Sequence, residues 1–366
     1  MTEIAVNGYP LYFDKNGINR YLKSILLNIH SSDIKITLFV PYGLKVKDFN
    51  TKIKIVNVGP NRKYFGIIWN QIIFPYYLLR RNIRVIWSPT HRISILLILL
   101  RFKIIITIHD LVSQYFPKTM KMGSYILDKV GLYLSVNYGN AFIVVSNRVK
   151  EELNLIYKIP LERISVTELG CDLQNINSTR YHRSSKKEYI LNVGTLEPRK
   201  NIKILIEAYS LLPDYLKDKY NLMIIGNEGW GNINVNLLTE KHGISDKVEL
   251  YESVNDNQLS FLYKNAKVSI YPSMYEGFGL PILESISLGV PVIVSNLPPM
   301  NQIAPKSTYP VDTNSVDCIR NSLTLLLSEN VILDSLKKYC LEEASKYDWK
   351  KSASKTVDVI RINSIS

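Results

Sequence analysis

Short apolar runs alternate with longer stretches of helical periodicity along most of this 366-residue chain. An apolar run without alternation is typical of a strand that is buried on both faces, as in a parallel sheet. Parallel strands need crossover connections, and these are usually helices. The pattern therefore predicts parallel α/β layers, and this is the strongest constraint that the sequence places on the fold.

The predicted elements fall into two sets. In the first set, strands are predicted at residues 35–40, 53–58, 85–88, 103–108 and 141–146, and helices at 19–29, 69–80, 125–137 and 148–156. In the second set, strands are predicted at residues 189–193, 222–225, 247–250, 268–271 and 292–294, and helices at 201–212, 256–265, 280–288 and 316–327.

A polar stretch without periodicity follows Cys171 and separates the two sets. We interpret it as a linker, which predicts two doubly wound domains. The expected limits are 1–174 for the N-terminal domain, 175–187 for the linker, 188–346 for the C-terminal domain and 347–366 for a final helix.

The composition agrees with two ordinary globular domains, since the chain is about twice as long as a typical domain. Charged residues make up 21% and the mean hydropathy is −0.01, which argues against disorder, a coiled coil and a polytopic membrane protein. The longest aliphatic stretch, residues 93–100, is too short to cross a bilayer. The N-terminus lacks the pattern of a secretory signal. The three cysteines, Cys171, Cys318 and Cys340, are odd in number and widely spaced, which favours a reducing cytoplasm and no disulfide or metal framework.

The net charge of +13 is concentrated in the first half of the chain. Residues 1–180 contain 24 Lys or Arg and 11 Asp or Glu, whereas the remainder contains 21 of each. From Phe49 to His109 there are ten basic residues and no acidic one. Such a block, interleaved with aromatic residues, suits an anionic membrane surface or a phosphorylated lipid. A merely solvated surface is the alternative, and nucleic acid is disfavoured because no nucleic-acid-binding motif is present.

The most informative segment is residues 273–294. A strand is predicted to end at Tyr271, a glycine-containing loop follows, and a helix is predicted to open near Leu280 with Pro281 in its first turn. Ligands of open α/β sheets bind beyond the carboxyl ends of the strands, where helix N-termini offer amides to anions. Glu276 in the loop can accept hydrogen bonds from sugar hydroxyls, and Glu284, one turn into the helix, can reach a ribose diol.

This segment resembles the E-x7-E signature of the retaining glycosyltransferases of the GT-B type, family four. The likeness covers most of the chain, with further matches at residues 17–21, 107–111, 145–146, 192–201 and 254–266. The resemblance implies two Rossmann-like domains that face one another across a cleft. It also implies that the second domain mainly holds the sugar nucleotide, that the first binds the acceptor, and that the final helix crosses back to the first.

The resemblance further implies that Arg199 and Lys200 hold the diphosphate of the donor. An Arg-Lys pair at a helix start is usually only solvated surface, but here it follows Gly194 and precedes a predicted helix. The guanidinium of an arginine, which can donate two parallel hydrogen bonds, and the ammonium of a lysine at a strand end would neutralise the charge that develops on a leaving diphosphate.

Two positions in the first half complete the expected site. His109 follows a continuous apolar strand and, like the family's matching histidine, is expected to contact the transferred sugar, although an isolated histidine is more often structural. Gly17 is expected in a loop that approaches the phosphate. Family members often have paired glycines there, whereas this chain has Asn16 and Gly17, so Arg20 is suggested as a source of charge.

The segment from Gly226 to Gly231 has its glycines in the reverse order of a dinucleotide fingerprint, so we interpret it as a loop lining the nucleotide pocket. Asp-x-Asp does not occur in the sequence and the histidines lack metal-ligand spacing, which predicts a reaction without metal or cofactor. The expected catalytic residues are His109, Glu276, Arg199 and Lys200. The expected donor-binding residues are Gly17, Gly194, Arg199, Lys200, Gly226, Val254, Glu276, Gly277, Phe278, Gly279, Leu280 and Glu284.

The sequence thus predicts a retaining, metal-independent hexosyltransferase of cell-surface polysaccharide or lipopolysaccharide synthesis. The resemblance slightly favours a donor of the GDP-mannose type, and the expected acceptor is a glycan or a polyprenyl-diphosphate-linked saccharide. The basic N-terminal half suggests a cytoplasmic enzyme that is peripheral on the inner face of the membrane. The alternatives are a sugar-nucleotide epimerase of GT-B architecture and a non-catalytic nucleotide-sugar-binding module.

Overall fold

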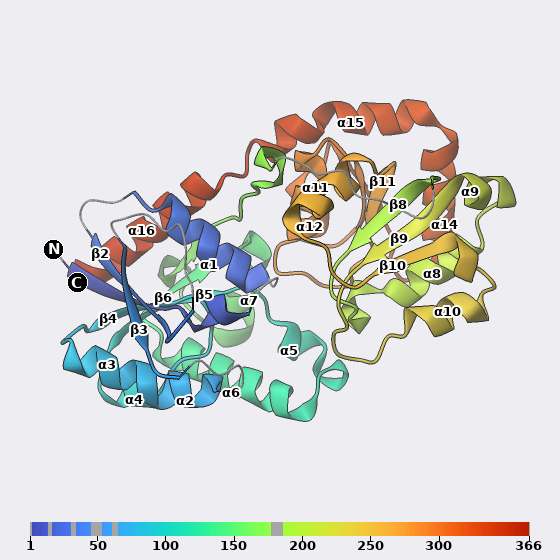
Figure 1. The fold of residues 1–366 in the computed structure, drawn as a ribbon. Helices are drawn as coiled ribbons and strands as arrows, with labels where there is room; N and C mark the ends of the chain where they lie inside the picture. The colour runs from blue at the N-terminus through green and yellow to red at the C-terminus, as the bar shows by residue number, and fades with distance from the viewer. Residues whose placement is uncertain are drawn as a thin grey trace. The chain divides into compact units, whose positions relative to one another are not determined.

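The computed structural model describes residues 2–13, 17–30, 34–44, 53–60, 65–176 and 186–365, and the chain forms two units (Figure 1). The first unit contains Met1–Tyr115, Met122–Gly170 and Asp348–Ser366, and the second contains Phe116–Lys121 and Cys171–Tyr347. The sequence predicted an N-terminal domain ending at residue 174, a C-terminal domain at residues 188–346 and a final helix from residue 347. Residues 177–185 of the expected linker lie outside the described residues.

The first unit is built on a seven-stranded parallel sheet in the order β3-β2-β1-β4-β5-β6-β7. Its strands are β1 (Thr2–Asn7), β2 (Ile34–Pro41), β3 (Ile53–Val58), β4 (Val85–Ser88), β5 (Lys103–Ile108), β6 (Ala141–Val144) and β7 (Ile164–Val166). The strand order reverses between β1 and β4, which pair with Val6 opposite Trp87.

Helices cover both faces of this sheet. They are α1 (Gly17–Asn28), α2 (Gly66–Ile68), the π turn η2 (Trp69–Ile73), α3 (Phe74–Arg80), α4 (Ile95–Leu99), α5 (Val112–Tyr115), α6 (Met122–Tyr138), α7 (Asn147–Tyr157) and α16 (Trp349–Ile365), with short 3-10 turns at Tyr9–Tyr12 and Leu161–Arg163. Right-handed crossovers place α1 on one face and the helices after β3, β4 and β5 on the other. The C-terminal helix α16 packs beside α1 (Figure 1).

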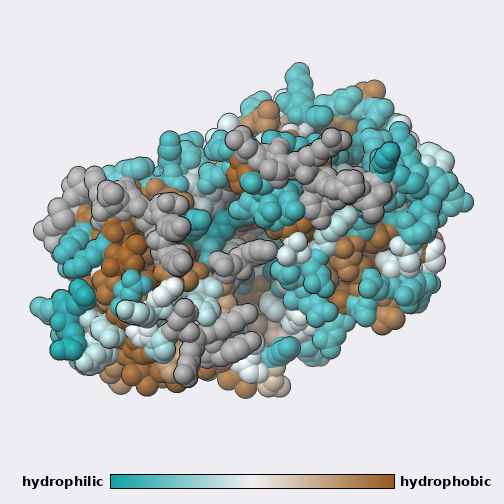
Figure 2. All heavy atoms as spheres, viewed as in Figure 1, coloured by the Kyte–Doolittle hydropathy of each residue, from teal (hydrophilic) through white to brown (hydrophobic). Residues whose placement is uncertain are grey.

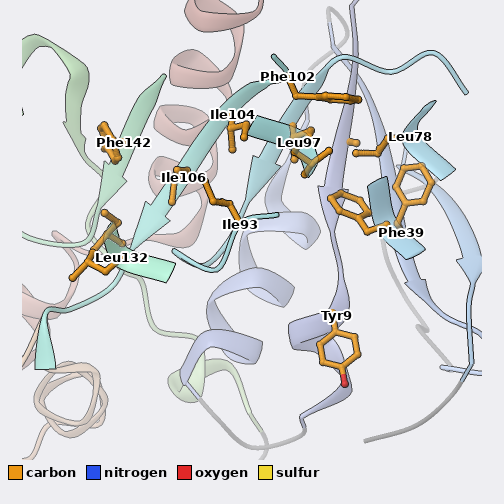
Figure 3. Packing of buried hydrophobic residues seen from close by; sticks show 14 of the residues in the cluster. Tyr9, Phe39, Leu78, Ile93, Leu97, Phe102, Ile104, Ile106, Leu132 and Phe142 are labelled. Atoms are coloured by element: carbon orange, nitrogen blue, oxygen red, sulfur yellow. The ribbon is translucent and has the colours of Figure 1, made fainter. Parts of the chain in front are cut away.

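One core cluster of the first unit lies between the sheet and the helices that follow β3 to β6, and apolar residues of α1 and α16 are buried on the other face. Figure 3 shows the helical Leu97 and Leu78 close to strand residues such as Ile104 and Phe39, all of them buried. The start of α16 is packed just as closely, because a Cβ at Gly170 would lie 2.3 Å from the backbone nitrogen of Trp349. The final helix is therefore an integral part of this unit.

The second unit has a six-stranded parallel sheet in the order β10-β9-β8-β11-β12-β13. Its strands are β8 (Glu188–Val193), β9 (Tyr220–Ile225), β10 (Val248–Tyr251), β11 (Val268–Tyr271), β12 (Val292–Ser295) and β13 (Thr308–Val311). Its helices are α8 (Ile202–Ser210), α9 (Asp214–Lys219), α10 (Val235–Lys241), α11 (Asp256–Lys264), α12 (Leu280–Ser287), α13 (Met300–Ile303), α14 (Val316–Ser328) and α15 (Asn330–Ala344), with 3-10 turns at Pro117–Thr119, Leu173–Asn175, Pro198–Lys200 and Ser245–Lys247.

The predicted α/β fold with two doubly wound, Rossmann-like domains is confirmed. The sequence pattern does not predict β1, β7 or β13, because β1 carries Glu3 and Thr2, β7 has only three residues, and Pro310 interrupts β13. The apolar residues 93–100 form the short helix α4, and none of the described helices is long and apolar enough to cross a membrane.

Candidate functional site

The two central strands of the second sheet, β8 and β11, lie where the strand order reverses. The chain leaves β8 toward one edge of the sheet and leaves β11 toward the other, and such a switch point is where open α/β sheets bind their ligands. The loop after β8 contains Arg199 and Lys200, and the loop after β11 contains Glu276. The topology therefore brings these three predicted residues to one place.

Glu276 forms ion pairs with both cations. Its Oε2 accepts a hydrogen bond from Arg199 Nη1 at 2.7 Å, and its Oε1 accepts one from Lys200 Nζ at 2.5 Å. Arg199 also donates through Nε to Glu197 Oε2 at 2.8 Å and through Nη1 to the carbonyl oxygen of Tyr275 at 3.0 Å. Two cations and two carboxylates thus form one closely balanced network.

Burial acts against each charge in this network. It raises the pKa of Glu197 and lowers the pKa of Lys200. Burial alone would also raise the pKa of Glu276, but the charges of Lys200 and Arg199 outweigh it and lower that pKa to about 2. Glu276 is therefore a carboxylate at neutral pH, held in that form by the two cations.

Two glycines let the loops after β8 and β9 pack against each other. The amide of Gly194 donates to the carbonyl oxygen of Ile225 at 2.9 Å, and that of Leu196 donates to Asn227 at 3.0 Å. A Cβ at Gly226 would lie 1.9 Å from the carbonyl oxygen of Gly194, so only glycine fits at this position. Both glycines lie at the carboxyl edge of the sheet, where the sequence predicted them to line the nucleotide pocket.

Helix α12 begins in the loop that carries Glu276. Gly277 and Phe278 are buried, Gly279 caps the helix with a φ of 123°, and Leu280 is its first residue. A side chain at Gly279 would need this unfavourable φ and would also meet Ile303 at 2.9 Å. The first-turn amides of α12 therefore lie at the carboxyl edge of β11, which is the arrangement that suits an anionic ligand.

Glu284 belongs to a second hydrogen-bonded group, one turn into α12. Its Oε2 accepts a hydrogen bond at 3.0 Å from the hydroxyl of Tyr263 on α11, and that hydroxyl lies 3.0 Å from the hydroxyl of Tyr271 at the end of β11. Burial raises the pKa of both tyrosines, so both stay protonated. Because Tyr263 gives its only proton to Glu284, Tyr271 donates to Tyr263. The two tyrosines fix the orientation of this carboxylate.

Val254 is half-buried and lies between β10 and α11. The next residue, Asn255, caps α11 through its side chain, which accepts from the amide of Gln258 at 2.9 Å, while Gln258 accepts from the amide of Asn255 at 2.9 Å. This capping box fixes the backbone beside Val254.

His109 follows β5 of the first unit and lies against two neighbours. Its Nε2 is 2.9 Å from the carbonyl oxygen of Pro89, and its ring meets that of Tyr21 edge-on, with centroids 4.8 Å apart. A carbonyl oxygen only accepts, so Nε2 donates and Nδ1 is an acceptor in this tautomer. Burial lowers the pKa of His109, which keeps the ring neutral at pH 7.

Gly17, the other predicted residue of the first unit, begins α1 and is exposed. A Cβ added there would meet no described atom within 4 Å, so the described surroundings give no steric reason for glycine. Arg20 lies in the first turn of α1 and is half-buried.

The structure thus brings Arg199, Lys200 and Glu276 into direct contact, holds Glu284 in a tyrosine group, and places His109 and Gly17 in the other unit. Sequence reasoning missed three partners, namely Glu197, Tyr263 and Tyr271. Glu197 lies two residues before Arg199, and that spacing was the only available signal. Within the described parts of the chain, no group of three or more His, Cys, Asp or Glu could hold a metal ion.

Comparison with known proteins agrees with this architecture. Residues 15–175 match the family model Glycosyltransferase Family 4, and residues 174–346 match the model Glycosyl transferases group 1. The sucrose-phosphate synthase of Thermosynechococcus elongatus has the same fold, with a TM-score of 0.78 and 17% identity over 99% of each chain.

Two curated relatives are mannosyltransferases. The chain is 30% identical over 239 residues to "O-antigen chain mannosyltransferase B" of Escherichia coli, covering 63% of each protein. It is 29% identical over 162 residues to the "GDP-mannose:cellobiosyl-diphosphopolyprenol alpha-mannosyltransferase" of Xanthomonas oryzae pv. oryzae, covering 43% of each. These matches span less than two thirds of the relatives' own length.

The fold is that of the GT-B class, with two Rossmann-like domains. The two family matches together extend from residue 15 to residue 346, and the chain belongs to glycosyltransferase family four.

The ion pairs of Glu276 should make the stability of the protein depend on pH in acid. The unfolded chain protonates Glu276 near pH 4.5, whereas the folded protein keeps it charged down to about pH 2. The unfolded state therefore binds more protons between these values, and the free energy of unfolding should fall as the pH drops through them. Glu276→Gln should weaken this dependence and cost about 3 kcal/mol at pH 7, as measured by urea unfolding across a pH series. The control Glu207→Gln, at an exposed position of α8, should show the wild-type dependence of unfolding free energy on pH. If Glu276→Gln shows that same dependence, the prediction is wrong.

The hydroxyl of Tyr263 should stabilise the fold through Glu284. Tyr263→Phe removes a donor from a buried carboxylate, which should lower the free energy of unfolding by about 1–3 kcal/mol. The matched control is Tyr215→Phe, since Tyr215 is exposed and its hydroxyl lies 3.0 Å from Ser328. That control should change the free energy by less than about 0.5 kcal/mol. If urea unfolding shows the same loss of free energy for Tyr263→Phe and Tyr215→Phe, the contact of Tyr263 with Glu284 does not stabilise the fold.

Proposed function

We propose that this protein transfers a hexose from a nucleotide diphosphate sugar, of the GDP-mannose type, to a hydroxyl of a glycan or lipid-linked saccharide in cell-surface polysaccharide synthesis. The observation that carries the proposal is the contact of Arg199 and Lys200 with Glu276 where the strand order reverses between β8 and β11. Family membership supports the reaction type, and the similarity to two mannosyltransferases, one of them GDP-mannose-dependent by name, supports the sugar and the nucleotide.

In this proposal Arg199 and Lys200 bind the diphosphate. Glu197 and Glu276 already balance their charge, so a diphosphate adds an excess of negative charge to the network. Repulsion from the phosphates then separates Glu276 from the two cations, since like charges in a partly buried site interact strongly. The released carboxylate accepts hydrogen bonds from sugar hydroxyls, and Glu284, oriented by Tyr263, accepts from the ribose.

The proposed transfer retains the anomeric configuration by front-face attack. The bond between the anomeric carbon and the phosphate oxygen breaks, the bond to the acceptor oxygen forms on the same face, and a phosphate oxygen takes the acceptor proton. Arg199 and Lys200 stabilise the charge that develops on the leaving diphosphate, together with the amides at the start of α12. The neutral His109 accepts a hydrogen bond from a hydroxyl of the transferred sugar through Nδ1.

The acceptor is assigned to the first unit because the basic residues are concentrated there. A polyprenyl-diphosphate-linked saccharide combines negative charge with an apolar chain, and both suit that unit. We therefore propose that the enzyme works in the cytoplasm, peripherally on the inner face of the membrane, without a metal ion or cofactor.

Loss of the two cations should abolish most of the activity. The double variant Arg199→Ala/Lys200→Ala should lower turnover at least about 10²-fold, the loss typical of removing transition-state electrostatics. Lys203→Ala is the matched control, because Lys203 lies exposed on the following helix α8 and should retain wild-type turnover. Full activity in the double variant would refute the proposed diphosphate site.

The reaction itself can be tested with a panel of nucleotide sugars and a polyprenyl-diphosphate-linked saccharide as acceptor. We expect transfer with GDP-mannose, an α-linked product by NMR, and undiminished turnover in excess EDTA. A new sugar nucleotide formed from the donor alone would indicate the epimerase instead, and nucleotide-sugar binding without turnover would indicate the binding module. Dependence on an added divalent ion would overturn the metal-free mechanism.

A further inference from the structure

One side of the first unit leaves many apolar side chains in solvent. Three neighbouring segments form it, namely residues 66–80 (α2, η2 and α3), α4 and α6, and we call their solvent side the outer helical face. Figure 1 shows these helices on the side of the sheet that is opposite to α1 and α16, as right-handed crossovers require. Brown, hydrophobic atoms are visible along this edge of the unit in Figure 2.

Hydrogen bonds through the loop after β4 join the three segments into one layer. Gln71 of the π turn donates through Nε2 to the carbonyl oxygen of Ile93 at 3.1 Å, and its Oε1 accepts from the amide of Ile95 at 2.9 Å. From the other side, the Ser135 hydroxyl on α6 donates to the carbonyl oxygen of His91 at 2.6 Å. The helices are therefore fixed side by side.

The exposed apolar residues follow helical stripes. Residues 66–80 and α6 each carry a stripe with spacings of four, four and three residues, which keeps side chains on one side of a helix. The stripes are Ile68, Ile72, Tyr76 and Leu79 on the first segment and Met122, Ile126, Val130 and Tyr133 on α6, between 40% and 71% exposed. Helix α4 adds Ile95, Leu96 and Leu99, and Leu100 follows directly after it. The opposite sides of the same helices bury Trp69, Leu78, Leu97 and Leu132 in the core. The stripes are thus a second apolar surface, in addition to the one that folds the unit.

The second unit has no comparable surface among its described residues. Its exposed large apolar residues are scattered along the sequence, and only Val331 and Leu341, ten residues apart on α15, share a helix; the others are Leu211, Tyr215, Leu237 and Leu297. Scattered apolar residues are normal on a soluble protein, whereas a contiguous patch marks an interaction site.

Cations border the outer helical face. They are Arg80, Arg81, Arg84, Arg92, Arg101 and Lys129, all exposed. Within the described ranges, only Arg92 among these six has a carboxylate within salt-bridge distance, namely Asp128 at 3.9 Å. Asp128 is the one acidic residue of α6; its carboxylate is only 16% exposed and also lies 2.8 Å from His91 Nε2. The face is therefore apolar at its centre and positive at its border.

We propose that the outer helical face docks on the surface of an anionic lipid bilayer. The cations pair with acidic headgroups while the stripes enter the boundary between headgroups and acyl chains. A second copy of the chain suits the face less well, because a symmetric contact would bring arginines of one face toward those of the other. The inference rests on the proposed peripheral location and specifies the surface responsible, and it is independent of the sugar that is transferred.

The test is flotation of the full chain with liposomes, without donor or acceptor. We expect binding to phosphatidylglycerol-containing vesicles at low salt, weaker binding at physiological salt, and none to pure phosphatidylcholine. Ile72→Ser/Leu99→Ser/Ile126→Ser removes one apolar residue from each segment and should lower the bound fraction at least about tenfold. Arg80→Gln/Arg81→Gln/Lys129→Gln should lower it by a similar factor. Leu237→Ser/Val331→Ser/Leu341→Ser, which changes three exposed residues of the second unit, should bind as the wild type does.

Light scattering and transfer to a water-soluble acceptor complete the test. We expect a monomer for the wild type and for all three variants, with turnover on the soluble acceptor unchanged in the Ile72/Leu99/Ile126 variant and in the second-unit control. A wild-type dimer that the Ile72/Leu99/Ile126 variant dissociates, without binding to vesicles, would assign the face to contact between copies and overturn the proposal. Equal vesicle binding by this variant and the second-unit control would also overturn it. Absence of sugar transfer together with normal flotation would refute the proposed reaction alone.

Discussion

Parallel pairing of every strand is the constraint on which both units depend. It requires a crossover after each strand, and it collects all carboxyl ends of the strands at one edge of each sheet. In the second sheet the strand order reverses between β8 and β11, so loops 76 residues apart in sequence meet there. The buried network of Arg199, Lys200, Glu197 and Glu276 is a consequence of that meeting, because two cations withdrawn from water require carboxylates nearby.

Most of the fold could be predicted from hydrophobic pattern, since strands buried on both faces read as continuous apolar runs. Residues 103–108 and 268–271 are of this kind and were predicted with the observed limits. β1 is a central strand, yet it was not predicted, because Glu3 lies within it. That side chain accepts hydrogen bonds from Lys35 and Thr37 on the neighbouring strand, so its place in the sheet depends on a partner about 30 residues away. The contacts of such a residue cannot be read from its own segment.

The structure brings three of the predicted site residues together, but the contacts between them were not predicted from the sequence. Sequence reasoning placed Glu276 toward the sugar and Arg199 and Lys200 toward the diphosphate, but gave no reason for the three to touch. The structure shows that they neutralise one another. The tyrosines that orient Glu284 come from another helix and another strand, and no spacing within the signature points to them. For the outer helical face, the sequence predicted a basic block interleaved with aromatic residues, but not which apolar side chains are exposed, because packing decides which side of a helix faces the core.

The π turn at Trp69–Ile73 sets the rotation of the residues before it relative to α3, and the sequence alone does not predict this turn. A π turn accommodates one residue more than an α-helical turn, and it absorbs that residue without displacing the rest of the helix. Within this turn Asn70 accepts a hydrogen bond from Asn7 on β1, and Gln71 accepts one from the amide of Ile95 at the start of α4. Loss of one residue from this turn would restore a regular helix and rotate the preceding turn by about 100°. The number of residues in the π turn therefore sets the direction in which Ile67 and Ile68 point relative to the exposed residues of α3. A deletion in this turn would change that direction more than a substitution would.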